Sequence, residues 1–399
     1  LELFHGRDLE GHHATILSTL AKEDDSSTDE WESVKEVRCV YYRQPNGVLA
    51  VKRIGLVLPT SLCSSQVCLG IVEQLNAGLV NGEEKTIHEN TVSSFLTLQH
   101  SEGCGVGSAN GSEEIEQRIL VGHLTHSSVD SNRTVLLEHG CEKLHNSYFE
   151  KVLAGRGHDA SNILLGSVQL DGGLNKVTQK ILLGIGIHDN VNTVDSTTKG
   201  SCNVANVLWQ EEEMSLLSPG LTLGLMYIEP NSNTCNISAQ SESLKAVAAE
   251  VASRLLSVAL RSGVNVILPT SSGLYDNALF LDSVLEIGSA EAGLAFGQQP
   301  SIAKSSGNNG TCSSGCLFVM DARGVDDSVE LVTGLAASGC HMIVMLTSRS
   351  FVPQHPMVPV TAINPVRGMS MLDVVKSMRM THNAHRRAEE GSGSGGGGD

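Results

Sequence analysis

Short apolar runs alternate with amphipathic segments along most of the chain. Apolar runs of strand length occupy residues 54–59, 94–98, 134–137, 180–187, 221–228, 264–268, 316–320 and 341–346. Apolar residues recur every three or four positions over residues 64–79, 243–261 and 328–338, which predicts helices. Strands that alternate with helices are typical of parallel sheets covered on both faces. The predicted fold class is therefore α/β, with mostly parallel sheets and flanking helices in two Rossmann-like units.

The pattern divides the chain into four parts. Residues 1–36 are polar and acidic, which indicates an extension. Residues 37–195 form an N-terminal α/β unit that carries clusters of His and Cys, and residues 196–385 form a C-terminal α/β unit. Residues 386–399 end in a run of Gly and Ser, which predicts a flexible tail.

Composition narrows the possible partners and the compartment. The 399 residues carry a formal net charge of -17, which would repel a phosphate backbone or an anionic membrane surface. No apolar stretch approaches the roughly 20 residues of a membrane span. Ten cysteines in a chain of this length, without a signal peptide, are not a disulfide framework. We expect a cytoplasmic protein that binds neither nucleic acid nor membrane.

Two motifs that follow predicted strands could carry chemistry. His100-Ser-Glu-Gly-Cys104-Gly places an imidazole and a thiol four residues apart, and such donors suit iron or zinc better than magnesium. The alternative is a strand-to-helix turn with a buried thiol. Glu138-His-Gly-Cys141-Glu-Lys-Leu-His145 offers two imidazoles, a thiol and two carboxylates around the start of a helix. Its alternative is a helix start stabilised by Glu142, with solvated histidines.

A third motif, Met345-Leu-Thr-Ser-Arg349-Ser, follows the predicted strand at residues 341–346. Its hydroxyl groups and guanidinium could hold a substrate carboxylate, because arginine offers a planar, bidentate fork. An ordinary surface arginine is the alternative. The Gly-rich stretch at residues 305–310 lacks the Lys-Ser/Thr ending of a phosphate-binding loop, so nucleotide binding is poorly supported.

These motifs, in this order, resemble the altronate/galactarate dehydratase family of sugar-acid dehydratases. The similar segments include Tyr42-Arg-Gln-Pro-Asn-Gly, Leu58-Pro-Thr-Ser-Leu-Cys63, His100-Ser-Glu-Gly-Cys-Gly, His139-Gly-Cys-Glu, Met320-Asp-Ala-Arg-Gly and Leu346-Thr-Ser-Arg. The resemblance spans roughly residues 40–365. It implies a carbon–oxygen lyase that dehydrates a hexonate or hexarate to a 2-keto-3-deoxy acid with the help of a divalent metal. Iron(II) is the expected metal, and manganese(II) is the alternative.

The resemblance also implies roles for particular residues. The metal ligands would be His100, Cys104, Cys141 and Glu142. The substrate would contact Cys63, His139, Ser348 and Arg349, and the catalytic base would be His145 or Lys304. The expected partners are a small sugar-acid substrate and further copies of the same chain.

Three segments depart from the family pattern, and in one of them, around residues 292–306, the family's Pro-Gly-Asn-Lys-x-Gly-Gly run is largely gone. Glu229-Pro-Asn-Ser-Asn-Thr-Cys235 replaces the family's Cys-Gly-Gly-Ser-Asp run, and Ser348-Arg-Ser350 replaces its Thr-Gly-Arg-Gly loop. These changes motivate an alternative function, in which a catalytically impaired protein of the same fold acts as a binding or assembly subunit.

Overall fold

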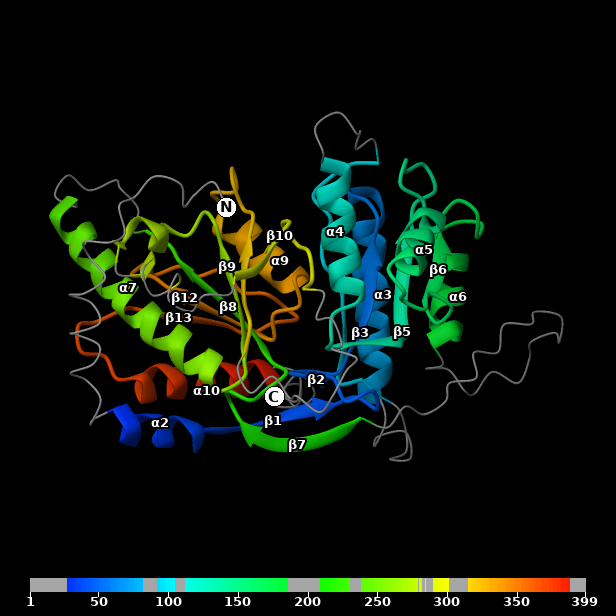
Figure 1. Ribbon diagram of the computed structural model, residues 1–399. Coiled ribbons are helices and arrows are strands. Elements are labelled where there is room, and N and C mark those ends of the chain that lie inside the picture. The colour runs from blue at the N-terminus through cyan, green and yellow to red at the C-terminus, as the bar shows by residue number, and fades with distance from the viewer. Residues whose placement is uncertain are drawn as a thin grey trace, which may run out of the picture.

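The computed structural model arranges the described part of the chain in two parallel sheets side by side, with a small antiparallel sheet beneath them (Figure 1). The described residues are 27–81, 92–104, 112–185, 209–229, 238–278, 280–281, 284, 290–300 and 315–387. The predicted α/β class, with mostly parallel sheets and flanking helices, is confirmed.

The N-terminal parallel sheet has the strand order β4-β3-β5-β6. Its strands are β3 (Ile54–Pro59), β4 (Ser94–Leu96), β5 (Val129–Glu138) and β6 (Leu164–Ser167). The helices around it are α3 (Leu62–Asn81), α4 (Ser112–Leu124), α5 (Asn146–Gly155) and α6 (Leu174–Ile185).

Helices cover both faces of this sheet. Val57 packs with residues of α3 and α6, whereas its neighbours Leu56 and Leu58 pack with residues of α4 and α5. Successive side chains of a strand point to opposite faces, so a strand covered on both sides must be apolar throughout. All six residues of β3 are buried, as this arrangement requires.

The C-terminal parallel sheet has the strand order β10-β11-β9-β8-β12-β13. Its strands are β8 (Thr222–Tyr227), β9 (Asn265–Pro269), β10 (Ala290–Leu294), β11 (Leu317–Met320), β12 (Met342–Leu346) and β13 (Val360–Ile363). The helices are α7 (Ser238–Arg261), a short 3-10 helix (Gly273–Asp276), α9 (Ser328–Ala337) and α10 (Met371–Arg387). Residues of α7 and α10 pack on one face, and residues of α9 pack on the other.

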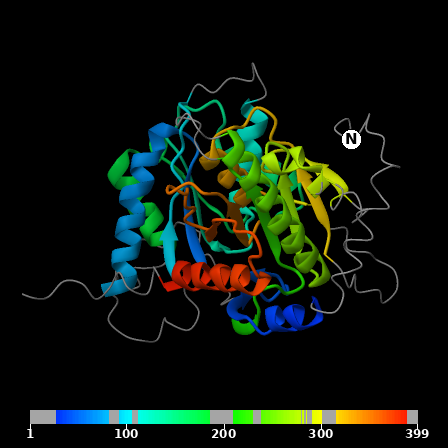
Figure 2. The same cartoon turned by 90° about the vertical axis from the view of Figure 1, so that its left-hand side faces the viewer.

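The third sheet joins distant parts of the sequence. Strand β1 (Arg38–Arg43) pairs antiparallel with β2 (Leu49–Ala50) and with β7 (Gln210–Ser215). Below the C-terminal parallel sheet, α10 lies above α2 (Ser27–Lys35), as Figure 2 shows. Strands β1 and β2 therefore pack with the C-terminal unit, although they directly precede the N-terminal unit in the sequence.

The two units share one hydrophobic core. Leu136 of β5 and Val121 of α4 belong to the same cluster as Leu335 of α9 and Ile343 of β12. Helices α4 and α9 approach so closely that a Cβ atom at Gly122 would overlap the backbone of Ala337. The lack of a side chain at this position allows the two helices to touch.

Buried histidines also connect the units. The Nε2 atom of His341 donates to the carbonyl of Leu49 (2.8 Å), and its Nδ1 accepts from the amide of Thr222 (3.0 Å). The Nε2 atom of His126 donates to the carbonyl of Cys340 (3.1 Å). Burial lowers the pKa of His126 to about 4 and also lowers the pKa of His341 below its ordinary value. Both rings are therefore neutral hydrogen-bonding groups near pH 7.

Two sequence-based expectations change. Residues 180–187 were expected to form a strand, and this is wrong, because residues up to Ile185 belong to α6. Val177, Ile181 and Ile185 recur every four residues and are all buried, which is the spacing of a helix face. Within the expected acidic extension, residues 27–35 form α2, and Val34 at its end is buried. In the described part of the chain, no helix combines the length and apolar character needed to cross a bilayer.

Candidate active site

Three loops meet at the carboxyl edge of the N-terminal parallel sheet. They follow β3, β4 and β5; Cys104 and Cys141 lie in the second and third loops, and Cys63 lies at the start of α3, directly after the first. The amide of Leu62 donates to the carbonyl of Glu102 (2.7 Å), and the amide of Lys143 donates to the carbonyl of Cys104 (3.2 Å). These backbone bonds hold the middle loop against the other two. Open α/β sheets bind ligands at this edge of the sheet.

The carboxylate of Glu142 fastens two of these loops together. Its Oε1 accepts from the Ser61 hydroxyl (2.7 Å) and from the amide of His139 (2.6 Å), and its Oε2 accepts from the amide of Gly140 (2.7 Å). Burial alone would raise the pKa of Glu142, but these hydrogen bonds outweigh it and the pKa lies below the ordinary value. Glu142 is therefore an ionised, buried group that shapes the turn before Cys141.

Both ring nitrogens of His100 already have partners. Its Nδ1 accepts from the amide of Glu102 (3.0 Å), which leaves Nε2 as the protonated nitrogen that donates to Glu116 (2.8 Å). The side chains of both residues are less than one-tenth exposed. In this arrangement no lone pair of the His100 ring is free for a metal ion.

The thiols of Cys104 and Cys63 both influence the pKa of the Cys141 thiol. The Cys141 thiol forms a hydrogen bond with the Cys104 thiol, and this bond is the largest cause of the raised pKa of Cys141. The charges of Cys104, Glu142 and Cys63 raise it further, so Cys63 lies within electrostatic reach of the pair. The Cys141 sulfur is also 3.6 Å from Nδ1 of His139.

His145 lies at the other end of the same loop and caps α5. Its Nδ1 is 3.5 Å from Oε2 of the buried Glu138, while half of the His145 side chain is exposed. A carboxylate at Nδ1 favours the tautomer that is protonated there, which leaves Nε2 as a proton acceptor. Glu138 is held in turn by the amide of Asn146 (2.7 Å).

Two of the four predicted metal ligands are already hydrogen-bonded to protein groups in this structure. His100 and Glu142 direct their polar atoms to protein partners, as described above. Among the residues that the structure describes, no three His, Cys, Asp or Glu side chains converge closely enough to hold one metal ion. The three thiols nevertheless gather at the same edge of the sheet.

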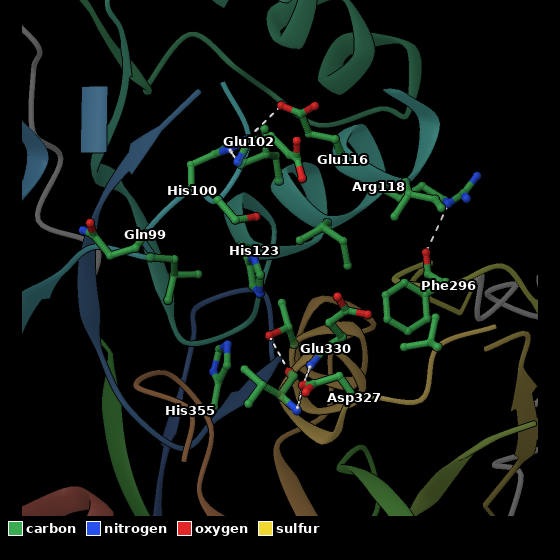
Figure 3. Close-up of a pocket in the computed structure, with 18 of the residues that line it drawn as sticks. Gln99, His100, Glu102, Glu116, Arg118, His123, Phe296, Asp327, Glu330 and His355 are labelled. Carbon is green, nitrogen blue, oxygen red and sulfur yellow. Dashed lines mark hydrogen bonds and ion pairs between the residues drawn. The ribbon is translucent and has the colours of Figure 1, made fainter. Parts of the chain in front are cut away.

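A large cavity borders the loop after β4 that contains His100 (Figure 3). Its volume is about 1120 Å³, above the roughly 300–1,000 Å³ of many small-molecule sites, so a six-carbon acid would fit. Its wall comes from the loop after β4, from α4 and α9, and from segments of the C-terminal unit. Residues 100–102 line it, and Cys104 follows two positions later.

Charged side chains at the cavity wall are mostly held by neighbours. Arg118 donates to the carbonyl of Phe296 (3.1 Å), and Arg323 pairs with Asp321 (2.7 Å). His123 and His355 face each other as stacked rings 5.5 Å apart, and burial lowers the pKa of both. The buried Nε2 of His123 has no hydrogen-bond partner in the described part of the chain.

The remaining predicted site residues lie elsewhere. Arg349 follows β12, and its Nε donates to the carbonyl of Glu229 (2.6 Å). Neither Arg349 nor its exposed neighbour Ser348 lines the cavity. Lys304 lies outside the described residues.

Comparison with known protein families finds a match over the part of the chain that contains these three loops. Residues 41–183 match the second domain of D-galactarate dehydratase/altronate hydrolase. The matched segment runs from β1 into α6 and contains Cys63, Cys104 and Cys141. No curated protein matches the chain.

Several residues of the matched segment that contact the predicted site residues could not be recognised from the sequence. Ser61, Glu116 and Gln169 each contact a predicted site residue, namely Glu142, His100 and His139. Ser61 lies two residues before Cys63 at a strand end, so its position could have drawn attention. Glu116 and Gln169 belong to other elements, and no local pattern relates them to the motifs.

Proposed function

We propose that the protein is a metal-dependent hydro-lyase that converts a hexonate or hexarate into a 2-keto-3-deoxy acid. The observation that carries the proposal is the meeting of three strand-end loops inside the segment that matches the dehydratase domain. These loops bring the thiols of Cys63, Cys104 and Cys141 to one edge of the sheet. The cavity beside the middle loop offers space for the substrate.

The reaction needs a base, because the proton next to a carboxylate is barely acidic. His145 is the base that the geometry favours. With Glu138 at its Nδ1, the exposed ring presents Nε2 to accept the proton from the carbon next to the carboxylate. Lys304 stays the alternative base, and it lies outside the described residues.

The departing hydroxyl and the growing negative charge need a Lewis acid, which iron(II) would supply when bound. His139 lies beside the thiols, with its Nδ1 near Cys141 and 3.4 Å from Nε2 of Gln169. If Nδ1 accepts from both groups, Nε2 carries the proton and can donate to an oxygen of the substrate. The predicted role of Ser348 and Arg349 in binding the carboxylate has no counterpart at this cavity, because neither residue lines it.

A direct assay tests this function. Protein purified without oxygen and supplied with iron(II) is incubated with a panel of aldonates and aldarates, and 2-keto-3-deoxy acids are measured by mass spectrometry. We expect turnover of at least one hexonate or hexarate, which a strong chelator abolishes. Absence of turnover with the whole panel, in protein that has bound iron, would contradict the dehydratase function and favour a binding or assembly role.

A further inference from the structure

One face of α4 contributes two buried polar side chains to the wall of the cavity (Figure 3). Glu116 and His123 are seven residues apart, so they lie on the same face of the helix, about 10 Å apart along its axis. Ile119 and Leu120 line the cavity between them and add apolar surface. This wall therefore offers hydrogen-bonding groups on either side of an apolar strip, which suits a ligand with both hydroxyl groups and C–H surface.

The carboxylate of Glu116 uses only one of its two oxygen atoms. Its Oε1 accepts from Nε2 of His100 (2.8 Å), whereas Oε2 is buried and has no hydrogen-bond partner in the described part of the chain. The side chain is 9% exposed. A buried carboxylate oxygen without a donor is costly, and an ionised carboxylate can only accept. The group that suits Oε2 is therefore a hydrogen-bond donor, such as a hydroxyl group of a ligand.

The imidazole of His123 is in a similar position at the other end of the strip. His123 is 2% exposed, and its buried Nε2 has no hydrogen-bond partner among the described residues. Burial lowers the pKa of His123, and the ring of His355 is stacked against it, so the ring is neutral near pH 7. A neutral imidazole can exchange a hydrogen bond with a hydroxyl group but offers no charge to a carboxylate.

The charges of the cavity wall also disfavour an anion. The described residues that line the cavity include five with carboxylates, namely Glu102, Glu116, Asp321, Asp327 and Glu330. The arginines among them are Arg118 and Arg323. Arg118 donates to the carbonyl of Phe296 (3.1 Å), and Arg323 directs two hydrogen bonds to Asp321 (2.9 and 2.7 Å). A second carboxylate on a ligand would therefore meet negative charge with both guanidinium groups already engaged.

We propose that Glu116 and His123 bind the hydroxyl groups of an uncharged sugar chain, so that the cavity selects a six-carbon aldonate over the corresponding aldarate. An aldonate has one carboxylate and a hydroxylated, uncharged tail, and the tail is the part that this wall suits. An aldarate has a carboxylate at each end. The identification of this ligand as a substrate rests on the proposed dehydratase function, whereas the selectivity of binding can be tested without turnover.

The test is isothermal titration calorimetry of the full chain, without added iron, with matched sets of ligands. Each set contains a hexonate, its hexarate and its hexitol, in the gluco, galacto and manno configurations. In at least one set, we expect the hexonate and the hexitol to bind about ten-fold more tightly than the hexarate. Glu116→Gln should bring the hexonate and the hexarate closer together in affinity, because it removes one carboxylate from the wall.

His123→Phe separates a binding role from a structural one. It should weaken hexonate binding about five- to ten-fold, because a hydrogen-bonding group is lost. The same variant should unfold at a higher temperature than the wild type, since phenylalanine keeps a ring against His355 and has no buried nitrogen to satisfy. Thr333→Val is the control, because the Thr333 hydroxyl also lies at the cavity but already donates to the carbonyl of Val329 (2.8 Å). Its affinities should match those of the wild type.

Three results would overturn the proposal. These are a hexarate that binds as tightly as the hexonate in every set, wild-type affinity in folded His123→Phe, and no binding of any hexonate or hexitol. The outcome for the enzyme is separate. Selective binding without turnover in iron-loaded protein would remove only the proposed function. Faster turnover of a hexarate than of the hexonates would remove only the selectivity.

Discussion

The hydroxyl of Ser61 donates a 2.7 Å hydrogen bond to the carboxylate of Glu142, which lies 81 residues further along the chain. The bond joins the loop after β3 to the loop after β5, and it does so at a buried position. The orientation of Cys141 therefore depends on a residue at another strand end.

This relationship predicts the effect of removing the charge of Glu142. Glu142→Gln should destabilise the protein by about 1.5–3 kcal/mol, because it weakens three hydrogen bonds to an ionised group. Thermal unfolding measures the loss, and thiol labelling should show faster reaction of Cys141. Glu114→Gln is the control, since Glu114 is largely exposed and makes only a long ion pair with Arg118. Equal losses of stability in the two variants would contradict the role of Glu142 in holding the two loops together.

The proposed base can be tested by a change that keeps the size of the side chain. His145→Gln should lower kcat by about 100-fold or more, because general-base catalysis commonly contributes 10²–10⁴-fold. KM should change little, since the ring is not proposed to bind the carboxylate. Steady-state kinetics on the substrate identified by the panel assay give both constants. A wild-type kcat in His145→Gln would exclude His145 as the base.

Buried histidines predict a loss of stability in acid. Burial lowers the pKa of His126 and His382 to about 4, and that of His355 and His385 to about 3. Between pH 6.5 and these values the unfolded chain binds protons that the folded protein excludes, so stability falls as the pH decreases. Each fully shifted group contributes up to about 1.4 kcal/mol per pH unit.

Urea unfolding between pH 7.5 and 5 measures this slope. His382→Phe should reduce it, because His382 is fully buried against the ring of Tyr41 (4.9 Å between centroids) and phenylalanine does not titrate. The half-exposed His145 provides the control, and His145→Gln should leave most of the slope in place. A pH-independent free energy of unfolding in the wild type would contradict the prediction.

The contact between α4 and α9 predicts opposite effects for two Gly→Ala substitutions. Gly122→Ala should destabilise the protein by about 1–3 kcal/mol, because the new methyl group would collide with the backbone of Ala337. Gly70→Ala, in the interior of α3 with open space around it, should stabilise by about 0.5–1 kcal/mol. Thermal unfolding of both variants provides the comparison. Similar shifts in the same direction would show that helix propensity, and not the contact between the units, decides the outcome.

The sequence predicts parallel strands such as β3 and β12 because these are buried apolar runs with distinct ends, but it misses β6, β10 and β13. It does not predict β7, whose residues Glu211, Glu212 and Glu213 suggest only an acidic surface. That strand forms because β1 supplies the hydrogen-bonding edge and Arg43 and Arg386 balance its charge. Such long-range pairing leaves no local pattern. Residues 180–187 were mistaken for a strand because they look like a local apolar run. The helical spacing to which they belong begins earlier, at Val177.

For the site, sequence reasoning placed the three motifs at strand ends, and the structure brings the loops of Cys63, Cys104 and Cys141 together. The partners of individual atoms could not be predicted. Glu142 turns toward its own loop, and His100 pairs with Glu116 on the following helix. Residue type defines which ligands a side chain could bind, but only tertiary packing decides which atoms are already occupied.

The pairing of β1 with β7 has a consequence for how this molecule could be taken apart. The chain leaves the small antiparallel sheet after Ala50 and re-enters it at Gln210, which lies opposite Arg43. The whole thiol-bearing unit is therefore a cassette inserted into the C-terminal framework, with its entry and exit at β2 and β7, the two strands that flank β1. Removing this cassette would expose the residues of α9 and β12 that pack against it, because the two units share one hydrophobic core.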